Sequence, residues 1–158
     1  MIMMAISLLV WIAAIGCGVM AGVYFAFSAF IMMAFARIDE AHGIAAMTAI
    51  NRVILSSLFM PLFWGTTIGS LVLAVLGPLC WSKPGSVAIL AGSLVYLVGM
   101  FLVTIAFNVP RNNALARADE EQAAVWTEYL VEWTRWNHVR TAASAVAAVL
   151  FIIALAVE

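Results

Sequence analysis

The chain has 158 residues, of which 66% are hydrophobic and only 9% are charged, and its formal net charge is -1 at pH 7. Soluble domains carry about 25% charged residues, so this composition excludes an ordinary soluble domain, and the near-neutral charge argues against nucleic acid as a partner. We therefore expect a single membrane domain, residues 1–158, with the lipid bilayer as one of its partners.

Four segments are long and apolar enough to cross a bilayer, which takes about 20 residues of helix. Their predicted limits are residues 4–35, 53–79, 87–107 and 141–157. The first segment is too long for the apolar part of a cleaved signal peptide, so we expect it to be retained. Open sheet edges cannot face lipid, and no alternating pattern indicates a barrel. The predicted fold is therefore all-α, a membrane four-helix bundle with up-down-up-down topology.

The three connections between these segments differ. Residues 37–52 are predicted to form a polar connection, and residues 80–86 a tight turn. Residues 118–138 are predicted to form an amphipathic helix before the fourth span, with Asp119 as its N-cap. At 100° per residue, this helix and its continuation place one set of side chains on a single face. These are Trp126, Tyr129, Trp133, Trp136, Asn137, Arg140 and Ser144.

Arginines are concentrated in the first and third connections, which lie on the same side of an up-and-down bundle. That side holds Arg37, Arg52, Arg111, Arg117, Arg135 and Arg140, whereas the second connection holds only Lys83. Positively charged loops favour the cytoplasm. We therefore expect the arginine-rich side in the cytoplasm and both termini outside, in a bacterial inner membrane.

Polar side chains gather where the four spans meet this same side. They are Tyr24, Ser28, Asn51, Arg52, Thr104, Asn108, Asn112, Asn137 and Arg140. Polar groups at membrane depth usually face a bundle interior or a cavity, which predicts a functional site. They are also compatible with residues that simply lie at the membrane interface, where Trp and Tyr form belts. Similarly, the asparagines near Pro110 either bond the carbonyl that proline frees or point into a cavity.

Histidine is the side chain that titrates closest to neutral pH, so His138 is the first candidate for a general base. In the helical projection it lies beside Thr134 and Thr141, away from Asn137 and Arg140. The two cysteines and His42 match no metal-ligand spacing, so no metal site is predicted.

The motifs GVYFAFSAFIM, AINRVILSSLFM, FLVTIAFNVPRNNALA and WTRWNHVRTAA follow one another between Gly22 and Ala143. In this order they resemble the DUF1772, or anthrone oxygenase-like, family of small integral membrane proteins. The most specific parts are N-x-P-x-N at residues 108–112 and W-x-x-W-N-x-x-R at residues 133–140. The chain departs from the family's common pattern at Met33, Arg111 and Asn113.

The resemblance implies a bundle that binds a hydrophobic aromatic small molecule, because the family includes enzymes that oxidise anthrones to anthraquinones. Such an oxygenase needs no cofactor beyond O2 as co-substrate, since an anthrone enolate reacts with O2 directly. The implied catalytic set is Asn137, Arg140, Asn108 and His138. The implied substrate-binding set is Trp133, Trp136, Asn51, Asn112 and Tyr24.

Two other classes of function stay open at this point. A non-enzymatic protein would use the same residues to bind a small molecule, or would dock a partner through the aromatic amphipathic helix. A transporter fits less well, because the chain has no internal repeat and few charged residues within its spans. A homo-oligomer is compatible with the sequence.

Overall fold

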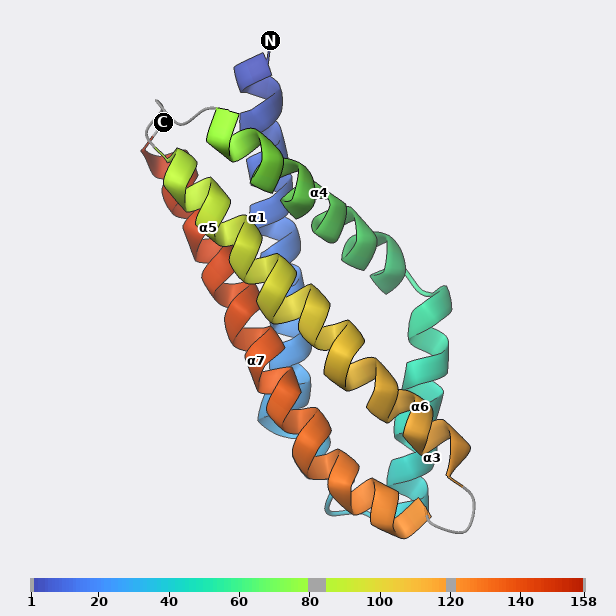
Figure 1. Ribbon diagram of the computed structural model, residues 1–158. Helices are drawn as coiled ribbons and strands as arrows, with labels where there is room; N and C mark the ends of the chain where they lie inside the picture. The colour runs from blue at the N-terminus through green and yellow to red at the C-terminus, as the bar shows by residue number, and fades with distance from the viewer. Residues whose placement is uncertain (1, 80–84, 119–121, 158) are drawn as a thin grey trace.

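The computed structural model describes residues 2–79, 85–118 and 122–157, and within these ranges the chain forms helices and no strand. Four helical stretches are long and apolar enough to cross a membrane: Met4–Phe35, Phe59–Gly77, Ser86–Arg117 and Ala123–Ala156. They run up and down, so that the first stretch begins and the last one ends at the same end of the molecule (Figure 1). The predicted all-α fold and membrane four-helix bundle are confirmed.

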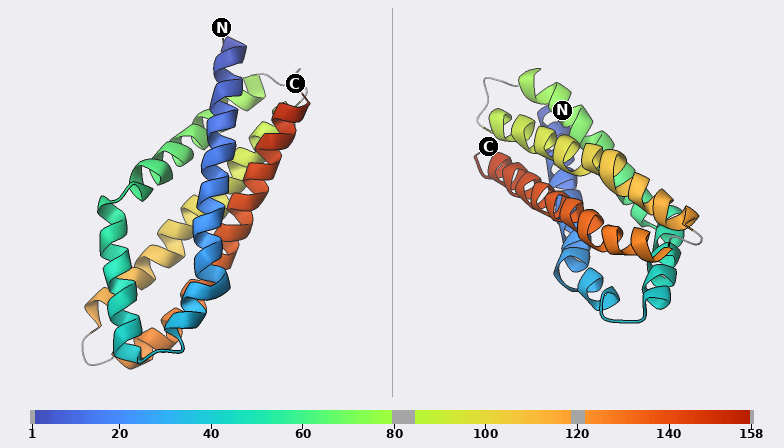
Figure 2. Two further views of the ribbon diagram at one scale, coloured as in Figure 1. Left: turned by 180° about the vertical axis from the view of Figure 1, so that it is seen from behind. Right: turned by 60° about the horizontal axis from the view of Figure 1, so that its bottom comes forward.

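The bundle is a ring of four helices. Helix α7 (Gln122–Ala156) packs against both α1 (Ile2–Ala26) and α5 (Ser86–Tyr96), and α4 (Phe59–Leu79) closes the ring against α1 and α5 (Figure 2). Glycines allow α5 and its continuation to approach α7 closely. A Cβ on Gly92 would lie 3.3 Å from the Ala147 carbonyl oxygen, and one on Gly99 would lie 2.5 Å from the Ala143 Cβ. Small residues are what membrane helices use for such contacts.

Two of the spans contain π-helical turns. The first span continues from α1 through η1 (Phe27–Ile31) into α2 (Met32–Phe35). The third continues from α5 through η3 (Leu97–Leu102) and η4 (Thr104–Asn108) into α6 (Val109–Arg117). The third span is therefore longer than the predicted 87–107. π-Helical turns are rare in proteins, and those that occur are often found at functional sites. Their position therefore indicates a candidate site in this part of the bundle.

The connection between the first and second spans is mostly helix α3 (Glu40–Val53), which is not predicted from the sequence. Asp39 caps this helix: its Oδ1 accepts from the backbone N–H of Ala41 at 3.0 Å and of His42 at 3.4 Å. Glu40 in the first turn and Arg52 in the last turn suit the helix dipole. These capping signals are present in the sequence.

An elbow separates α3 from α4, so the second span begins at Phe59 and not at residue 53. A 3₁₀ turn, η2 (Ile54–Ser56), ends at Ser57, whose backbone is extended with ψ 172°. The Ser57 hydroxyl accepts from the Phe59 N–H at 3.2 Å and so opens α4. Pro61 lies in the first turn of α4, where its missing N–H costs nothing.

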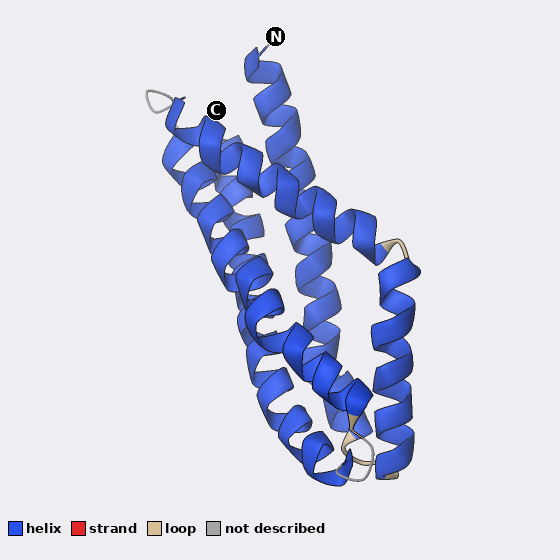
Figure 3. Cartoon of the chain, turned by 45° about the vertical axis from the view of Figure 1, so that its right-hand side comes forward, coloured by secondary structure: helices blue, strands red, loops and turns tan. Residues whose placement is uncertain are grey.

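The predicted amphipathic helix and the fourth span are one continuous helix, α7, of 35 residues. Such a helix is about 50 Å long, more than the roughly 30 Å of a bilayer core. Its first turns pack with α3 and α6 at one end of the bundle (Figure 3). The proposed cap Asp119 and residues 80–84 of the predicted turn lie outside the described residues.

The buried side chains form two clusters. The larger fills the bundle between α1, α4, α5 and α7, and includes Val10, Met20, Tyr96 and Phe151. The smaller, which we call the aromatic cluster, lies toward α3 and α6. Its members are Met32, Ile44, Met47, Leu115, Trp126, Tyr129 and Trp133.

Candidate functional site

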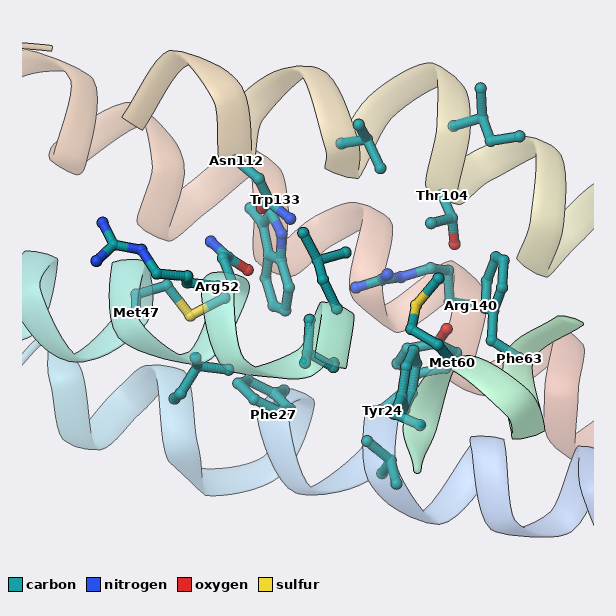
Figure 4. A pocket seen from close by; sticks show the side chains of 18 of the residues that line it. Tyr24, Phe27, Met47, Arg52, Met60, Phe63, Thr104, Asn112, Trp133 and Arg140 are labelled. Atoms are coloured by element: carbon teal, nitrogen blue, oxygen red, sulfur yellow. The ribbon is translucent and has the colours of Figure 1, made fainter. Parts of the chain in front are cut away.

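A cavity of about 490 Å³ borders both clusters, at the level of the π-helical turns (Figure 4). This volume lies within the roughly 300–1,000 Å³ typical of small-molecule sites. Its walls come from all four spans and from α3. Six of the lining residues are aromatic in addition to Tyr24: Phe27, Phe59, Phe63, Trp64, Phe101 and Trp133. Such walls suit a flat apolar molecule.

Arg140 carries a charge and lines this cavity, and it is buried, with 5% of its surface exposed. Its guanidinium carbon lies 4.3 Å from the ring centre of Tyr24 and 5.0 Å from that of Trp133. The ion pairs in the described ranges involve Arg111, Arg135 and His42, so Arg140 has no acidic partner there. A buried charge is costly unless it is paired. The cavity therefore offers a positive group that an anionic ligand would neutralise.

Asn137 fixes the position of Arg140. Its Oδ1 accepts a hydrogen bond from Arg140 Nη2 at 2.7 Å. Its Nδ2 donates to the Tyr24 carbonyl and to the Ser28 hydroxyl, both at 2.7 Å. The amide thus bonds α7 to the first span, and it does not line the cavity. The catalytic role implied for Asn137 stays a prediction, and in the structure both ends of its amide are bonded to groups of the protein itself.

Trp133 forms one wall of the cavity and ends a ladder of stacked rings. Trp126 and Tyr129 stack with centroids 5.7 Å apart, and Tyr129 and Trp133 stack at 5.6 Å, with 16° between the planes in both pairs. Phe27 meets Trp133 edge-on at 5.7 Å. Most of the face predicted by helical projection is therefore buried, with Trp136 half-buried, and Trp133 packs between this ladder and the cavity.

Asn51 and Asn112 line the cavity toward α3 and α6. The Tyr129 hydroxyl donates to Asn112 Oδ1 at 2.7 Å and accepts from Asn51 Nδ2 at 3.4 Å. These bonds join α3, α6 and α7. Tyr24, Asn51, Asn112, Trp133 and Arg140, all singled out from the sequence, therefore meet at one cavity.

Asn108 and Trp136 do not line this cavity. Asn108 is buried and donates from Nδ2 to the Trp133 carbonyl at 3.1 Å, so it joins η4 to α7. Trp136 stacks on Phe107, with ring centroids 3.6 Å apart and planes 5° apart. Neither Asn108 nor Asn112 bonds a carbonyl of its own helix in the described ranges. Both make interhelical contacts. The catalytic role implied for Asn108 and the substrate-binding role implied for Trp136 stay predictions, and neither side chain borders this cavity.

His138 lies on the outer surface, as the helical projection indicates. It is exposed and lines a separate groove with Phe25, Ser28 and Thr141, between the first span and α7. It is therefore not placed to take a proton from a molecule beside Arg140. The catalytic role implied for His138 stays a prediction, and the structure places this side chain in a groove separate from the cavity that Arg140 lines.

Several cavity residues were not identified as site residues from the sequence. Phe27, Phe59, Phe63 and Phe101 are ordinary apolar residues of membrane spans by composition, and nothing in their spacing separates them from lipid-facing positions. The elbow at Ser57 brings Phe59 and Phe63 to the cavity. No group of three His, Cys, Asp or Glu residues able to hold a metal ion occurs among the described residues.

The fold and the cavity define a class: an integral membrane protein with an aromatic, positively charged pocket at one end of a four-helix bundle. A family model described as anthrone oxygenase matches residues 46–150, and the chain belongs to this family. The match includes Asn51, Asn112, Trp133 and Arg140. No curated protein and no solved structure matches the chain.

Proposed function

We propose that the chain is an oxygenase that uses O2 to oxidise a flat, enolisable aromatic substrate of the anthrone type. The family match supports this reaction, and one observation on the site carries it. Arg140 is buried beside a cavity with aromatic walls, and no acid of the described chain neutralises it. Such a site favours a substrate that becomes an oxyanion during reaction.

The reaction balances without a further redox partner. The substrate has a CH2 group opposite a ketone, and loss of one CH2 proton gives an enolate whose oxygen carries the charge. This electron-rich ring transfers electrons to O2, and a C–O bond forms at the former CH2 carbon to give a peroxide. The O–O bond then breaks as the second hydrogen of that carbon is lost. One oxygen atom becomes the new carbonyl, and the other leaves as water with the two hydrogens.

The cavity residues have distinct roles in this proposal. Trp133 stacks on the flat substrate, and the Arg140 guanidinium stabilises the enolate oxygen in surroundings where water does not screen the charge. Asn137 is a positioning residue, because it holds Arg140 through its Oδ1. Among the described residues, those that line the cavity include no carboxylate and no histidine. We propose that the substrate loses its proton to water at the cavity mouth, and that Arg140 retains the ionised form.

The test uses the wild type, Arg140→Met and Arg135→Gln in lipid vesicles, each supplied with an anthrone and O2. Arg135 is an exposed arginine of the same helix and does not line the cavity, so its variant is the matched control. Removing one oxyanion partner typically lowers turnover by about 100-fold or more. We expect that loss for Arg140→Met and none for Arg135→Gln, with quinone formation and O2 consumption as readouts.

Equal rates of quinone formation in all three preparations and in empty vesicles would contradict the proposal. A wild type that binds the anthrone without accelerating its oxidation would instead support the alternative, a non-enzymatic binding or helper protein built on the same cavity. An O2 electrode and the quinone absorbance distinguish these results in one experiment.

A further inference from the structure

The mouth of the cavity is apolar along one part of its length and polar along another. Among the lining residues that are exposed, Leu55, Trp64, Ile105 and Val109 are apolar, with exposed fractions of 68%, 47%, 50% and 40%. Arg52 and Asn113 are exposed and polar. The cavity therefore opens through a slit that has an apolar part and a polar part.

The chain order places these two parts at different depths. On one side of the slit, Ile105 and Asn113 are eight residues apart in η4 and α6, or about 12 Å along a helix. On the other side, Trp64 lies in α4, Leu55 lies in the elbow and Arg52 lies at the end of α3. The apolar part thus runs along α4, the elbow, η4 and the first turn of α6, and the polar part lies at the end where α3 and α6 pack together.

The elbow has an exposed apolar surface. Val53, Leu55 and Leu58 are 63%, 68% and 88% exposed, and in a protein with four candidate membrane spans we take this patch to face hydrocarbon. With that placement, the slit runs from the hydrocarbon of the bilayer toward its headgroup region. A molecule in the slit meets apolar surface at one end and a cation at the other.

Arg52 has no carboxylate partner in the described ranges, where the recorded ion pairs use other cations. Asn112 and Asn113 line the same end of the cavity. In Figure 4, Arg52 lies at one end of the labelled side chains and Phe63 at the other, with Trp133 and Asn112 nearer the middle. The cavity thus has two cationic positions, a buried one at Arg140 and an exposed one at Arg52.

We infer that the substrate is a lipophilic aromatic acid that enters sideways from the bilayer and binds with its acidic substituent at Arg52. Its flat ring lies against Trp133 with the reacting oxygen toward Arg140. This inference rests on the proposed function, because it names the substrate class of the same site. Arg52 is then a specificity-determining residue, since a guanidinium pairs with a carboxylate through charge-assisted hydrogen bonds.

The experiment measures binding, so it does not depend on turnover. The probes are a dihydroxyanthraquinone and the same ring system carrying one carboxylate, added to vesicles of phosphatidylcholine that contain the protein. Dissociation constants come from quenching of tryptophan fluorescence. The variants are Arg52→Gln and Arg117→Gln. Arg117 is an exposed arginine of α6 that does not line the cavity, so its variant is the control for a general loss of surface charge.

We expect Arg52→Gln to raise the dissociation constant of the carboxylated probe about tenfold, as for loss of one charge-assisted hydrogen bond. The uncharged probe should bind this variant within about twofold of the wild type, and Arg117→Gln should change neither constant. Equal weakening for both probes, an equal effect of Arg117→Gln, or no effect of Arg52→Gln would overturn the inference. If Arg52 instead holds a lipid phosphate, the variant will not discriminate between the probes.

A second pair of variants tests entry from the membrane. Val109→Trp places a large side chain on the rim of the slit, and Leu58→Trp places the same side chain on the neighbouring lipid-facing surface. We expect Val109→Trp to slow association of the uncharged probe at least fivefold, and Leu58→Trp to leave the rate unchanged. Equal association rates in both variants and the wild type would show that the probe enters elsewhere.

Discussion

Polar side chains in the two halves of the bundle have different hydrogen-bond partners. In the larger cluster, hydroxyls bond within their own helix: Thr67 donates to the Phe63 carbonyl and Ser93 to the Ile89 carbonyl. Around the cavity, asparagines bond between helices, as Asn137 does to Tyr24 and Asn108 to Trp133. The first arrangement leaves helices free to pack closely on small residues. The second ties α7 to the first and third spans beside the cavity, which these two asparagines do not line.

The largest expected effect on stability comes from a substitution in the closely packed half. Phe151→Ala removes a fully buried ring, and the lost contacts together with the cavity left behind should cost about 3–5 kcal/mol. Phe63→Ala, at the cavity wall, should cost less, because this ring already borders open space. Steric-trapping or denaturant unfolding of both variants in the same detergent measures the difference. Equal costs would mean that the two halves are packed alike.

Asn137→Ala should lower both stability and activity. It removes two interhelical hydrogen bonds, each worth about 0.6 kcal/mol on average in membrane proteins, and it leaves Arg140 without its amide partner. We expect a loss of about 1–2 kcal/mol in unfolding free energy and about tenfold in turnover. Asn137→Gln, which retains the amide at a shifted position, is the comparison. Full activity in the alanine variant would contradict the positioning role.

Ser28→Ala should have a smaller effect of the same kind. The Ser28 hydroxyl accepts from Asn137 Nδ2 and lies 3.1 Å from the Thr141 hydroxyl. Its removal leaves Asn137 bonded to the Tyr24 carbonyl and to Arg140, so we expect a cost of about 0.6 kcal/mol. Thermal unfolding of the single and double variants with Asn137→Ala checks this. The two costs should not add, because both substitutions disrupt one hydrogen-bonded group.

His138→Gln should have the smallest effect. The side chain is exposed in a groove on the outside of the bundle, and it is not a cavity residue. We expect turnover within about twofold of the wild type and stability within about 0.5 kcal/mol, as for surface substitutions in general. A loss of activity comparable to that of Arg140→Met would show that proton transfer uses this histidine, and the assignment of roles would need revision.

The sequence predicted the fold class, because four long apolar runs admit few alternatives in a membrane. It did not predict helix α3, because residues 37–52 are polar at their start and follow a long apolar span, although the Asp39 cap and the charges at either end of the helix are signals for it. The start of the second span was misplaced for a related reason. Apolar residues continue across the elbow, and only Ser57 and Pro61 mark the break.

For the site, helical projection correctly predicted which side chains of α7 point the same way. It grouped Trp133 with Arg140 and separated His138 from both, and the structure agrees. It could not tell Asn137 from a substrate contact, because a projection shows which way a side chain points and not which bonds it makes. The phenylalanines of the cavity wall were missed since lipid-facing and cavity-facing rings look the same in a sequence.

The central claim is that Arg140 stabilises an anionic oxygen in an aromatic cavity. A hydroxyanthraquinone bound in the cavity tests it directly, because such a dye changes colour when its hydroxyl ionises. With the wild type in vesicles, we predict ionisation at a pH at least one unit lower than in vesicles without protein, since a buried cation favours the anion. With Arg140→Met, the bound dye should lose this shift. Ionisation of the bound dye at the same pH in both proteins would contradict the account.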